Sequence, residues 1–248
     1  MEMIIFLSIV GVIVYFFIKK QSSGINTNAP VQTRVIQYFV QKTVFPGNAN
    51  YTGNVKFDTE YDELVKSQVS IDEVKGRAFE KLGLDESELT EIEPIHFENY
   101  YYGTEADIED FLNRISIMNA QQMLLRPSKE SIYRQANIII GEGKDGKLRS
   151  SAYQVTWLFT TPKQVCIYVE IIYLHKNEID EITRQFLWKH IASIHASRKT
   201  LKIKGKSEKF DTFCLNIAGG EHFECSMIPT DYTSRSINAM KQRLIDYS

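Results

Sequence analysis

The sequence predicts an α+β protein with an N-terminal single transmembrane helix, a helical middle region and a C-terminal antiparallel β-barrel or sandwich closed by a C-terminal helix. Three observations support this prediction: an apolar run at the start of the chain, apolar residues at helical spacing in the middle, and short alternating segments bounded by turn residues towards the end. The expected divisions are an anchor at 1–20, a flexible linker at 21–33, a helix-rich region at 34–136 and a β domain at 137–248.

The anchor prediction rests on Met3–Ile18, MIIFLSIVGVIVYFFI. This run rises roughly 24 Å as a helix, short of the roughly 30 Å of hydrocarbon in a bilayer, but Lys19 and Lys20 can snorkel and the bilayer can thin. A cleaved signal peptide is the alternative, although no basic residue precedes the run and no small-x-small site follows it. The two lysines predict a single-pass protein of the cell inner membrane with its bulk in the cytoplasm.

Composition indicates a folded chain, since 43% of the residues are hydrophobic and only 24% are charged. The three cysteines, Cys166, Cys214 and Cys225, are odd in number and lack CxxC spacing, which favours free thiols in a reducing compartment. Acidic residues concentrate in Asp58–Asp110 and basic residues in the rest. Either two solvated surfaces differ, or the basic part faces anionic lipid or nucleic acid.

Helices are expected through most of the middle region. Residues 34–45 place Val35, Ile36 and Phe39 on one face, and this helix could dock on the domain or lie in the membrane interface. Ser70 and Glu73 form a capping-box pattern at the start of a helix that Gly83 ends. Further helices are expected at 59–66, 105–117 and 126–136, with one strand at 93–102.

Strands dominate from residue 137 onwards. The glycine-rich segment GEGKDGK follows the first of them and predicts a hairpin turn; it is no P-loop, because neither Gly-Lys pair is followed by Ser or Thr. Residues 164–174 are apolar on both faces and should form a central strand covered on both sides. The other expected strands are 151–160, 183–188, 189–197, 211–218 and 221–227, with a polar turn at 175–182 and a closing amphipathic helix from Ser234.

The segment QVCIYVEIIYLHKNEIDEITRQFLWKHIASI, together with FCLNIAGGEHFECSM and the closing helix, resembles the bacterial pleckstrin-homology-like (PH-like) domains of the PH/GRAM superfamily. His190-Ile191 and Ile194 match a short element of that pattern. The stretch RSSAYQVTWLFTTPKQVCIYV is also similar to a group of uncharacterised bacterial proteins that share the domain. The resemblance covers Arg149–Ser248 and implies a fold rather than a function, because PH-like folds serve many purposes.

No catalytic or cofactor motif is present. The five histidines form no HExxH or other ligand spacing, and the chain has no GxSxG nucleophile motif. We therefore expect no catalytic residue, no cofactor and no metal site, and an enzyme with dispersed catalytic residues is only the third hypothesis for this chain.

One constellation could bind a ligand: the basic segment Arg198–Lys209, RKTLKIKGKSEK. Lys202 alternates with Leu201, so one strand face would present ammonium groups while the other packs. A basic loop of this kind resembles the place where some PH-like relatives bind phosphoinositides; the alternative is a solvated loop. Nucleic acid is not expected, because no aromatic residue interleaves the lysines. The candidate lipid- or anion-binding residues are Arg198, Lys199, Lys202, Lys204, Lys206 and Lys209.

These observations predict a membrane-anchored cytoplasmic adaptor that holds a protein partner at the membrane. The second hypothesis is a PH-like module that binds anionic lipid through residues 198–209.

Overall fold

The computed structural model describes residues 28–42, 55–104, 106–113, 133–203 and 206–247. The helices are α2 (Val31–Lys42), α3 (Val55–Ser67), α4 (Ile71–Leu82) and α7 (Asp231–Asp246), with short 3-10 turns η1 (Glu86–Glu88) and η2 (Trp188–His190). The strands are β1 (Ile95–Tyr101), β2 (Ile140–Glu142), β3 (Leu148–Ser150), β4 (Ala152–Thr160), β5 (Gln164–Tyr173), β6 (Glu178–Leu187), β7 (Ile191–Ile203), β8 (Lys206–Ile217) and β9 (His222–Met227). Residues 106–113 and 133–135 are also helical.

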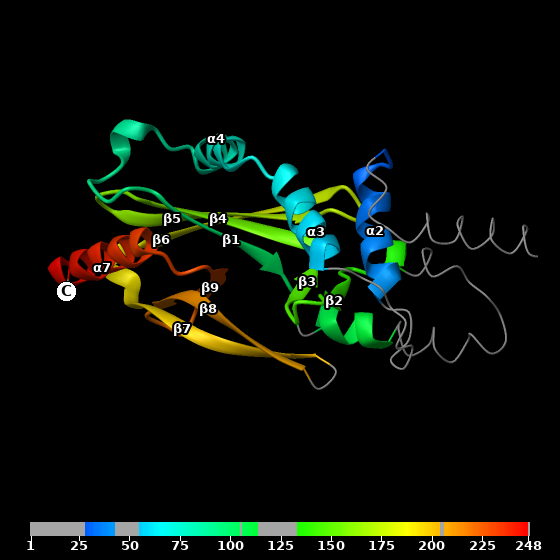
Figure 1. The fold of residues 1–248 in the computed structure, drawn as a ribbon. Helices are drawn as coiled ribbons and strands as arrows, with labels where there is room; N and C mark the ends of the chain where they lie inside the picture. Colours follow the sequence, from blue (N-terminus) through cyan, green and yellow to red (C-terminus); the bar gives the residue numbers. More distant parts are fainter. Residues whose placement is uncertain (1–27, 43–54, 105, 114–132, 204–205, 248) are drawn as a thin grey trace, which may run out of the picture.

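Two antiparallel sheets enclose the core. One has the strand order β1-β4-β5-β6 and the other the order β7-β8-β9. Figure 1 shows α4 over one side of the four-stranded sheet and the three-stranded sheet on its other side, with α7 at one end and α2, α3 and the β2-β3 hairpin at the opposite end. The rings of Phe97 and Phe213 join the two sheets at a centroid distance of 5.4 Å.

Strands β4 and β5 are covered on both faces, as the apolar pattern of residues 164–174 predicts. Val165, Cys166 and Ile167 are all fully buried, although neighbouring residues on a strand point to opposite faces. Phe79 of α4 packs against Phe159 of β4 at a ring distance of 4.8 Å. The expectation of a doubly covered central strand is therefore confirmed.

Helix α4 has the ends that its sequence predicts. The Ser70 hydroxyl accepts a hydrogen bond from the Glu73 amide, and Gly83 ends the helix with a φ of 63°, a left-handed conformation that glycine adopts at low cost. Arg77 on this helix donates two hydrogen bonds of 2.8 Å to the fully buried carboxylate of Glu170 on β5. This bidentate pair fixes the position of α4 on the sheet.

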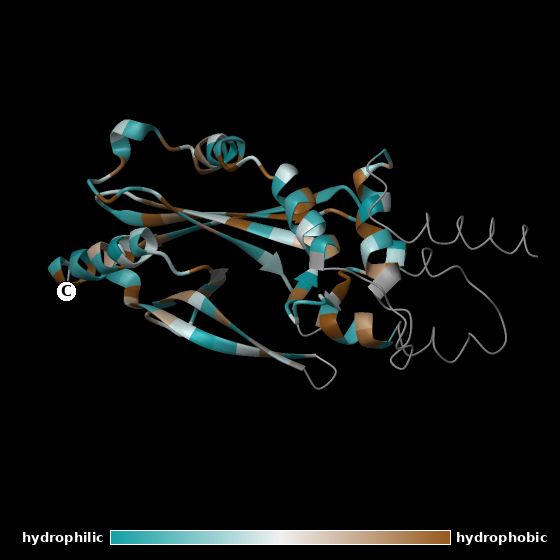
Figure 2. Cartoon of the chain, in the orientation of Figure 1, coloured by the Kyte–Doolittle hydropathy of each residue, from teal (hydrophilic) through white to brown (hydrophobic). Residues whose placement is uncertain are grey.

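Helix α7 closes one end of the two sheets. Its amphipathic character is visible in Figure 2, and its apolar residues Ile237 and Met240 are buried. The Tyr232 hydroxyl donates to the Pro94 carbonyl over 2.5 Å. At the far end of the helix, Tyr247 stacks on Trp188 of η2. The predicted closing helix is thus present and begins three residues before Ser234.

The β2-β3 hairpin is held against α3 by a buried arginine. Arg149 donates to both carboxylate oxygens of Asp62 at 2.7 Å and to both oxygens of Asp145 at 2.8 and 2.9 Å. Gly143 lies so close that an added Cβ would be 2.2 Å from Nη1 of Arg149 and 2.8 Å from the nearer carboxylate oxygen of Asp58. A side chain at this position would displace the guanidinium of Arg149 and its carboxylate partners, which gives the glycine-rich segment a structural role.

This network makes stability depend on pH. Hydrogen bonds from Arg149 lower the pKa of Asp145 from 3.8 to about 2. Because the folded-state pKa lies below the unfolded value, Asp145 stabilises the fold above about pH 4, and this contribution is lost as the pH falls through about 2. At about pH 5, the wild-type protein should have a larger free energy of unfolding than Asp145→Asn. This difference should become smaller as the pH approaches 2, and urea unfolding of the two proteins measures it. A difference in free energy of unfolding that stays constant over this pH range would contradict the lowered pKa of Asp145.

The predicted fold class needs correction. Among the described residues, no helix has both the length and the apolar character needed to cross a bilayer. The helix α7 has 16 residues, whereas a span needs about 20 apolar ones, and α7 is amphipathic rather than uniformly apolar. The predicted anchor at 1–20, with its apolar run Met3–Ile18, lies outside the described residues. The structure is α+β with mixed helices and antiparallel sheets, and the membrane-spanning, single-pass description is not supported.

The strand expected at 93–102 is present as β1. It lies within the region 34–136 and pairs with β4 of the region 137–248, so residues of both regions share one four-stranded sheet. Helix α2 begins at Val31, three residues earlier than expected, and its residues Val35, Ile36 and Phe39 are buried in the same core. Of the two interpretations of this amphipathic helix, docking on the domain is the one observed. Residues 114–132, including most of a predicted helix, lie outside the described part.

Candidate functional site

Strand β6 is the feature of the described surface that most resembles a binding site. It is the edge of the four-stranded sheet and has ten residues, of which only Phe186 is buried. Ile179, Ile182 and Leu187 are 54%, 37% and 37% exposed, and they make up half of the large exposed apolar side chains in the described chain. A long, open edge with exposed apolar residues is what natural proteins usually avoid unless the edge is used.

The pairing of β6 with β5 shows which face of the sheet each β6 side chain occupies. Ile182 lies opposite Val169, and Phe186 opposite Val165, so these two lie on one face of the sheet. The same face carries Asp180 and Arg184, each two residues from Ile182. An exposed apolar side chain therefore lies between an acid and a base.

The other face of β6 is tied to α4. Glu181 accepts hydrogen bonds from Lys81 and from the Tyr168 hydroxyl, both at 2.6 Å, and these contacts lower the pKa of Glu181. The strand is thus held firmly in the sheet from the α4 side. A rigid strand loses little conformational freedom when it binds a partner.

The outer backbone of β6 is open. The ladder with β5 uses one side of the strand, and within the described ranges no backbone–backbone hydrogen bond outside that ladder involves residues 179–187. The Thr183 carbonyl accepts a hydrogen bond of 3.2 Å from the Arg184 guanidinium. Such an edge presents a row of amide donors and carbonyl acceptors to any extended chain that comes alongside.

The basic residues predicted to bind lipid or anions lie elsewhere, on the β7-β8 hairpin. This segment is two paired strands rather than a loop, because Arg198–Ile203 belongs to β7 and pairs with β8. Arg198 is paired with Asp211 at 2.9 Å and Lys199 with Glu224 at 2.5 Å. Lys202 and Lys209 are exposed on the hairpin. Lys204 lies outside the described residues, and of Lys206 only the backbone, in β8, is described.

The other potentially reactive side chains are the possible metal ligands, the cysteines and the histidines. The described residues contain no group of three or more His, Cys, Asp or Glu side chains that could hold a metal ion. All three cysteines are free and buried. Burial raises the pKa of Cys166 to about 11 and that of Cys225 further, which makes these two thiols poor nucleophiles. His175 is the most deeply buried histidine.

Sequence reasoning missed the candidate edge because residues 175–182 were predicted to form a turn. The turn is much shorter: Asn177 adopts a positive φ of 60°, and β6 begins at the next residue. The Lys176-Asn177 pair was the available signal, since asparagine tolerates the left-handed region that a tight hairpin requires. The charges of Glu178, Asp180 and Glu181 hid the strand, because β-propensity is low for acidic residues.

The resemblance to PH-like domains is not tested by comparison with known proteins and stays a prediction. Comparison with protein-family models, with curated proteins and with solved structures gives no match to this chain.

Proposed function

We propose that this chain is a binding protein that accepts an extended strand of a partner protein along β6. The observation that carries the proposal is the open, ten-residue edge with its alternating apolar and charged side chains. Strand addition of this kind derives affinity from main-chain hydrogen bonds and specificity from the side chains on one face.

The charged residues of β6 determine which residue types a partner strand should carry. In an antiparallel arrangement, a partner strand should present an acidic residue opposite Arg184, an apolar residue opposite Ile182 and basic residues opposite Asp180 and Glu178. A second copy of β6 fits less well. The register that pairs Asp180 with Arg184 of the copy also places the Glu178 carboxylate opposite the aromatic ring of Phe186.

The resemblance to PH-like domains is compatible with a binding protein, because PH-like folds serve many purposes. Binding of anionic lipid by residues 198–209 receives less support, because Arg198 and Lys199 are already ion-paired. Ion-paired cations attract a charged surface less than free ones do.

A peptide pair tests the proposal. A fluorescent peptide of sequence ETVTKTK should bind the full chain about tenfold more tightly than KTVTETE, because exchanging the charges turns attraction into repulsion at three positions. The substitution Ile182→Lys should abolish binding, and Ile245→Lys on α7, at a residue that is 66% exposed, should leave it unchanged. Fluorescence anisotropy measures all four cases.

Several outcomes would overturn the proposal. Equal affinity for the two peptides, or no binding of either, would exclude charge-selective strand addition at β6. Sedimentation equilibrium supplies the other decisive outcome: a dimer that Ile182→Lys dissociates would show that a second copy, rather than another protein, occupies the edge.

A further inference from the structure

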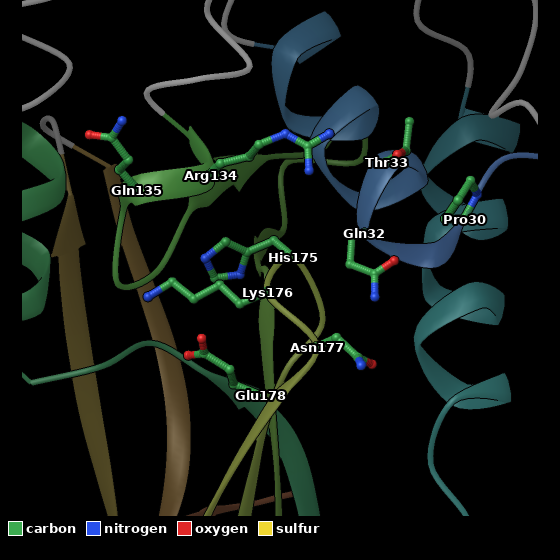
Figure 3. A pocket seen from close by; sticks show the side chains of 9 residues that line it. All are labelled: Pro30, Gln32, Thr33, Arg134, Gln135, His175, Lys176, Asn177 and Glu178. Atoms are coloured by element: carbon green, nitrogen blue, oxygen red, sulfur yellow. The ribbon is translucent and has the colours of Figure 1, made fainter.

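An open cleft of about 980 Å³ between α2 and the β5-β6 turn is lined mainly by polar side chains. Figure 3 shows them, with Gln32 on α2 and with His175, Lys176 and Asn177 on the turn. Small-molecule sites are usually lined by apolar and aromatic side chains with only a few polar groups. A smaller pocket elsewhere on the molecule fits that description better.

This smaller pocket, of about 290 Å³, lies between α3, the end of β1 and the start of β3. Its apolar walls are three tyrosine rings and three aliphatic side chains, from Tyr100, Tyr102, Tyr153, Val65, Leu148 and Ile228. Ile228 is 56% exposed, although it is a large apolar residue. A ligand with apolar surface would remove Ile228 from water, and this burial favours binding.

The aromatic wall of the pocket is held in place by its neighbours. The Tyr100 ring stacks on the ring of the fully buried Tyr61 at 6.2 Å and meets the Tyr153 ring edge-on at 5.6 Å. The Tyr100 hydroxyl donates to the Asp62 carboxylate over 2.6 Å. A wall that is already fixed loses little conformational freedom on binding, and a flat aromatic ligand can pack on it as the tyrosines pack on one another.

The charged side chains of the lining leave an excess of positive charge. Arg149 donates two hydrogen bonds of 2.7 Å to the Asp62 carboxylate, so this cation and this acid compensate each other. Lys66 and Lys147 also line the pocket, and neither ammonium group forms an ion pair with another residue of the described chain. Lys147 acts on Asp145 only at longer range, where it helps to lower the pKa of that carboxyl.

The two lysines flank the Arg149–Asp62 ion pair. Lys66 lies one helical turn after Asp62 on α3, and Lys147 lies two residues before Arg149, so each lysine is on the same side of its segment as the ion pair. An anion bound between the two ammonium groups would offset the repulsion of their like charges.

We propose that this pocket binds a small aromatic carboxylate. The ring packs against Tyr100 and Ile228, and the carboxylate accepts hydrogen bonds from Lys66 and Lys147. Asn99 supplies a neutral donor: its Oδ1 accepts from the Tyr100 amide over 2.8 Å, so its Nδ2 is the atom left to donate to a ligand. The pocket lies apart from β6 and does not depend on strand addition there.

Calorimetric titration of the full chain with three indole compounds tests this proposal. Indole-3-acetate, indole-3-acetamide and tryptamine share one ring and differ in charge. Indole-3-acetate should bind about tenfold more tightly than the neutral amide, because only its carboxylate forms charge-assisted hydrogen bonds with the lysines. Tryptamine, a cation, should bind more weakly than either.

Substitutions assign the two parts of the ligand to the two parts of the pocket. The double variant Lys66→Gln/Lys147→Gln should weaken indole-3-acetate about tenfold and leave the affinity for indole-3-acetamide unchanged. Ile228→Ser should weaken both compounds about fivefold, because both cover the same apolar surface.

A control separates this pocket from general attraction to lysines. Lys189→Gln, at an exposed lysine of η2, should change neither affinity. All the substituted side chains are exposed, so thermal unfolding should give the midpoint of the wild type for every variant. Equal affinity for the three compounds, or no binding of any, would overturn the proposal. So would tighter binding of octanoate than of indole-3-acetate, which would make the pocket a site for aliphatic acids.

Discussion

Replacing Arg149 with methionine should lower the free energy of unfolding by about 3–5 kcal/mol. The side chain of Arg149 is 3% exposed and is the ion-pair partner of both Asp62 and Asp145. Methionine retains much of the volume of the stem but leaves two partly buried carboxylates without their cation, and removing one partner of a buried pair is strongly destabilising. Urea unfolding of the two proteins at neutral pH measures the difference.

Arg198→Met is the matched control, because it removes the same group from an exposed ion pair. Arg198 is 66% exposed and pairs with Asp211 on the surface of the β7-β8 hairpin. Surface ion pairs contribute little, so the midpoint of unfolding should hardly move. If both variants lost the same stability, burial of the Arg149 network would not be the cause.

Trp188→Ala should be comparably destabilising, by about 3–5 kcal/mol. Trp188, the first residue of η2, is almost completely buried. Its ring stacks on Tyr247 at the end of α7, and its indole N–H donates to the Thr161 carbonyl at 2.9 Å. Truncation leaves a cavity and an unsatisfied carbonyl where the closing helix meets the sheets. Differential scanning calorimetry of both proteins measures the loss.

A pair of conservative substitutions separates the hydrogen bond from the packing. Trp157 is also buried, but its indole nitrogen has no hydrogen-bond partner in the described part of the chain. Trp188→Phe loses a satisfied donor, whereas Trp157→Phe removes an unsatisfied one, so the first should cost about 1 kcal/mol more than the second. Equal losses would mean that ring size alone determines the effect.

Local patterns in the sequence predict those elements whose ends are set by their own residues. Ser70 and Gly83 mark the ends of α4, and the two-sided apolar character of residues 164–174 identifies a central strand. Turn glycines likewise predict the β2-β3 and β8-β9 hairpins, and the helical spacing of apolar residues predicts the closing helix.

Features that depend on distant residues could not be predicted in this way. The pairing of β1 with β4 and the contacts of Asp62 with Arg149 join residues far apart in the chain, and no local pattern encodes them. The candidate edge was missed because acidic residues in β6 disfavour a strand locally, while the ladder with β5 outweighs that preference. The cleft at His175 likewise combines three segments that only the fold brings together.

The separation of β1 from β4 also affects how the chain folds. Strands β4, β5 and β6 follow one another through short turns and can pair early, whereas β1 must wait until the intervening residues 102–151 have closed into a loop. Closing a loop of about 50 residues carries an entropic cost of about 3.5 kcal/mol. We therefore expect the β4-β5-β6 meander to form before β1 adds to its edge, with the long-range addition of β1 as the slower step.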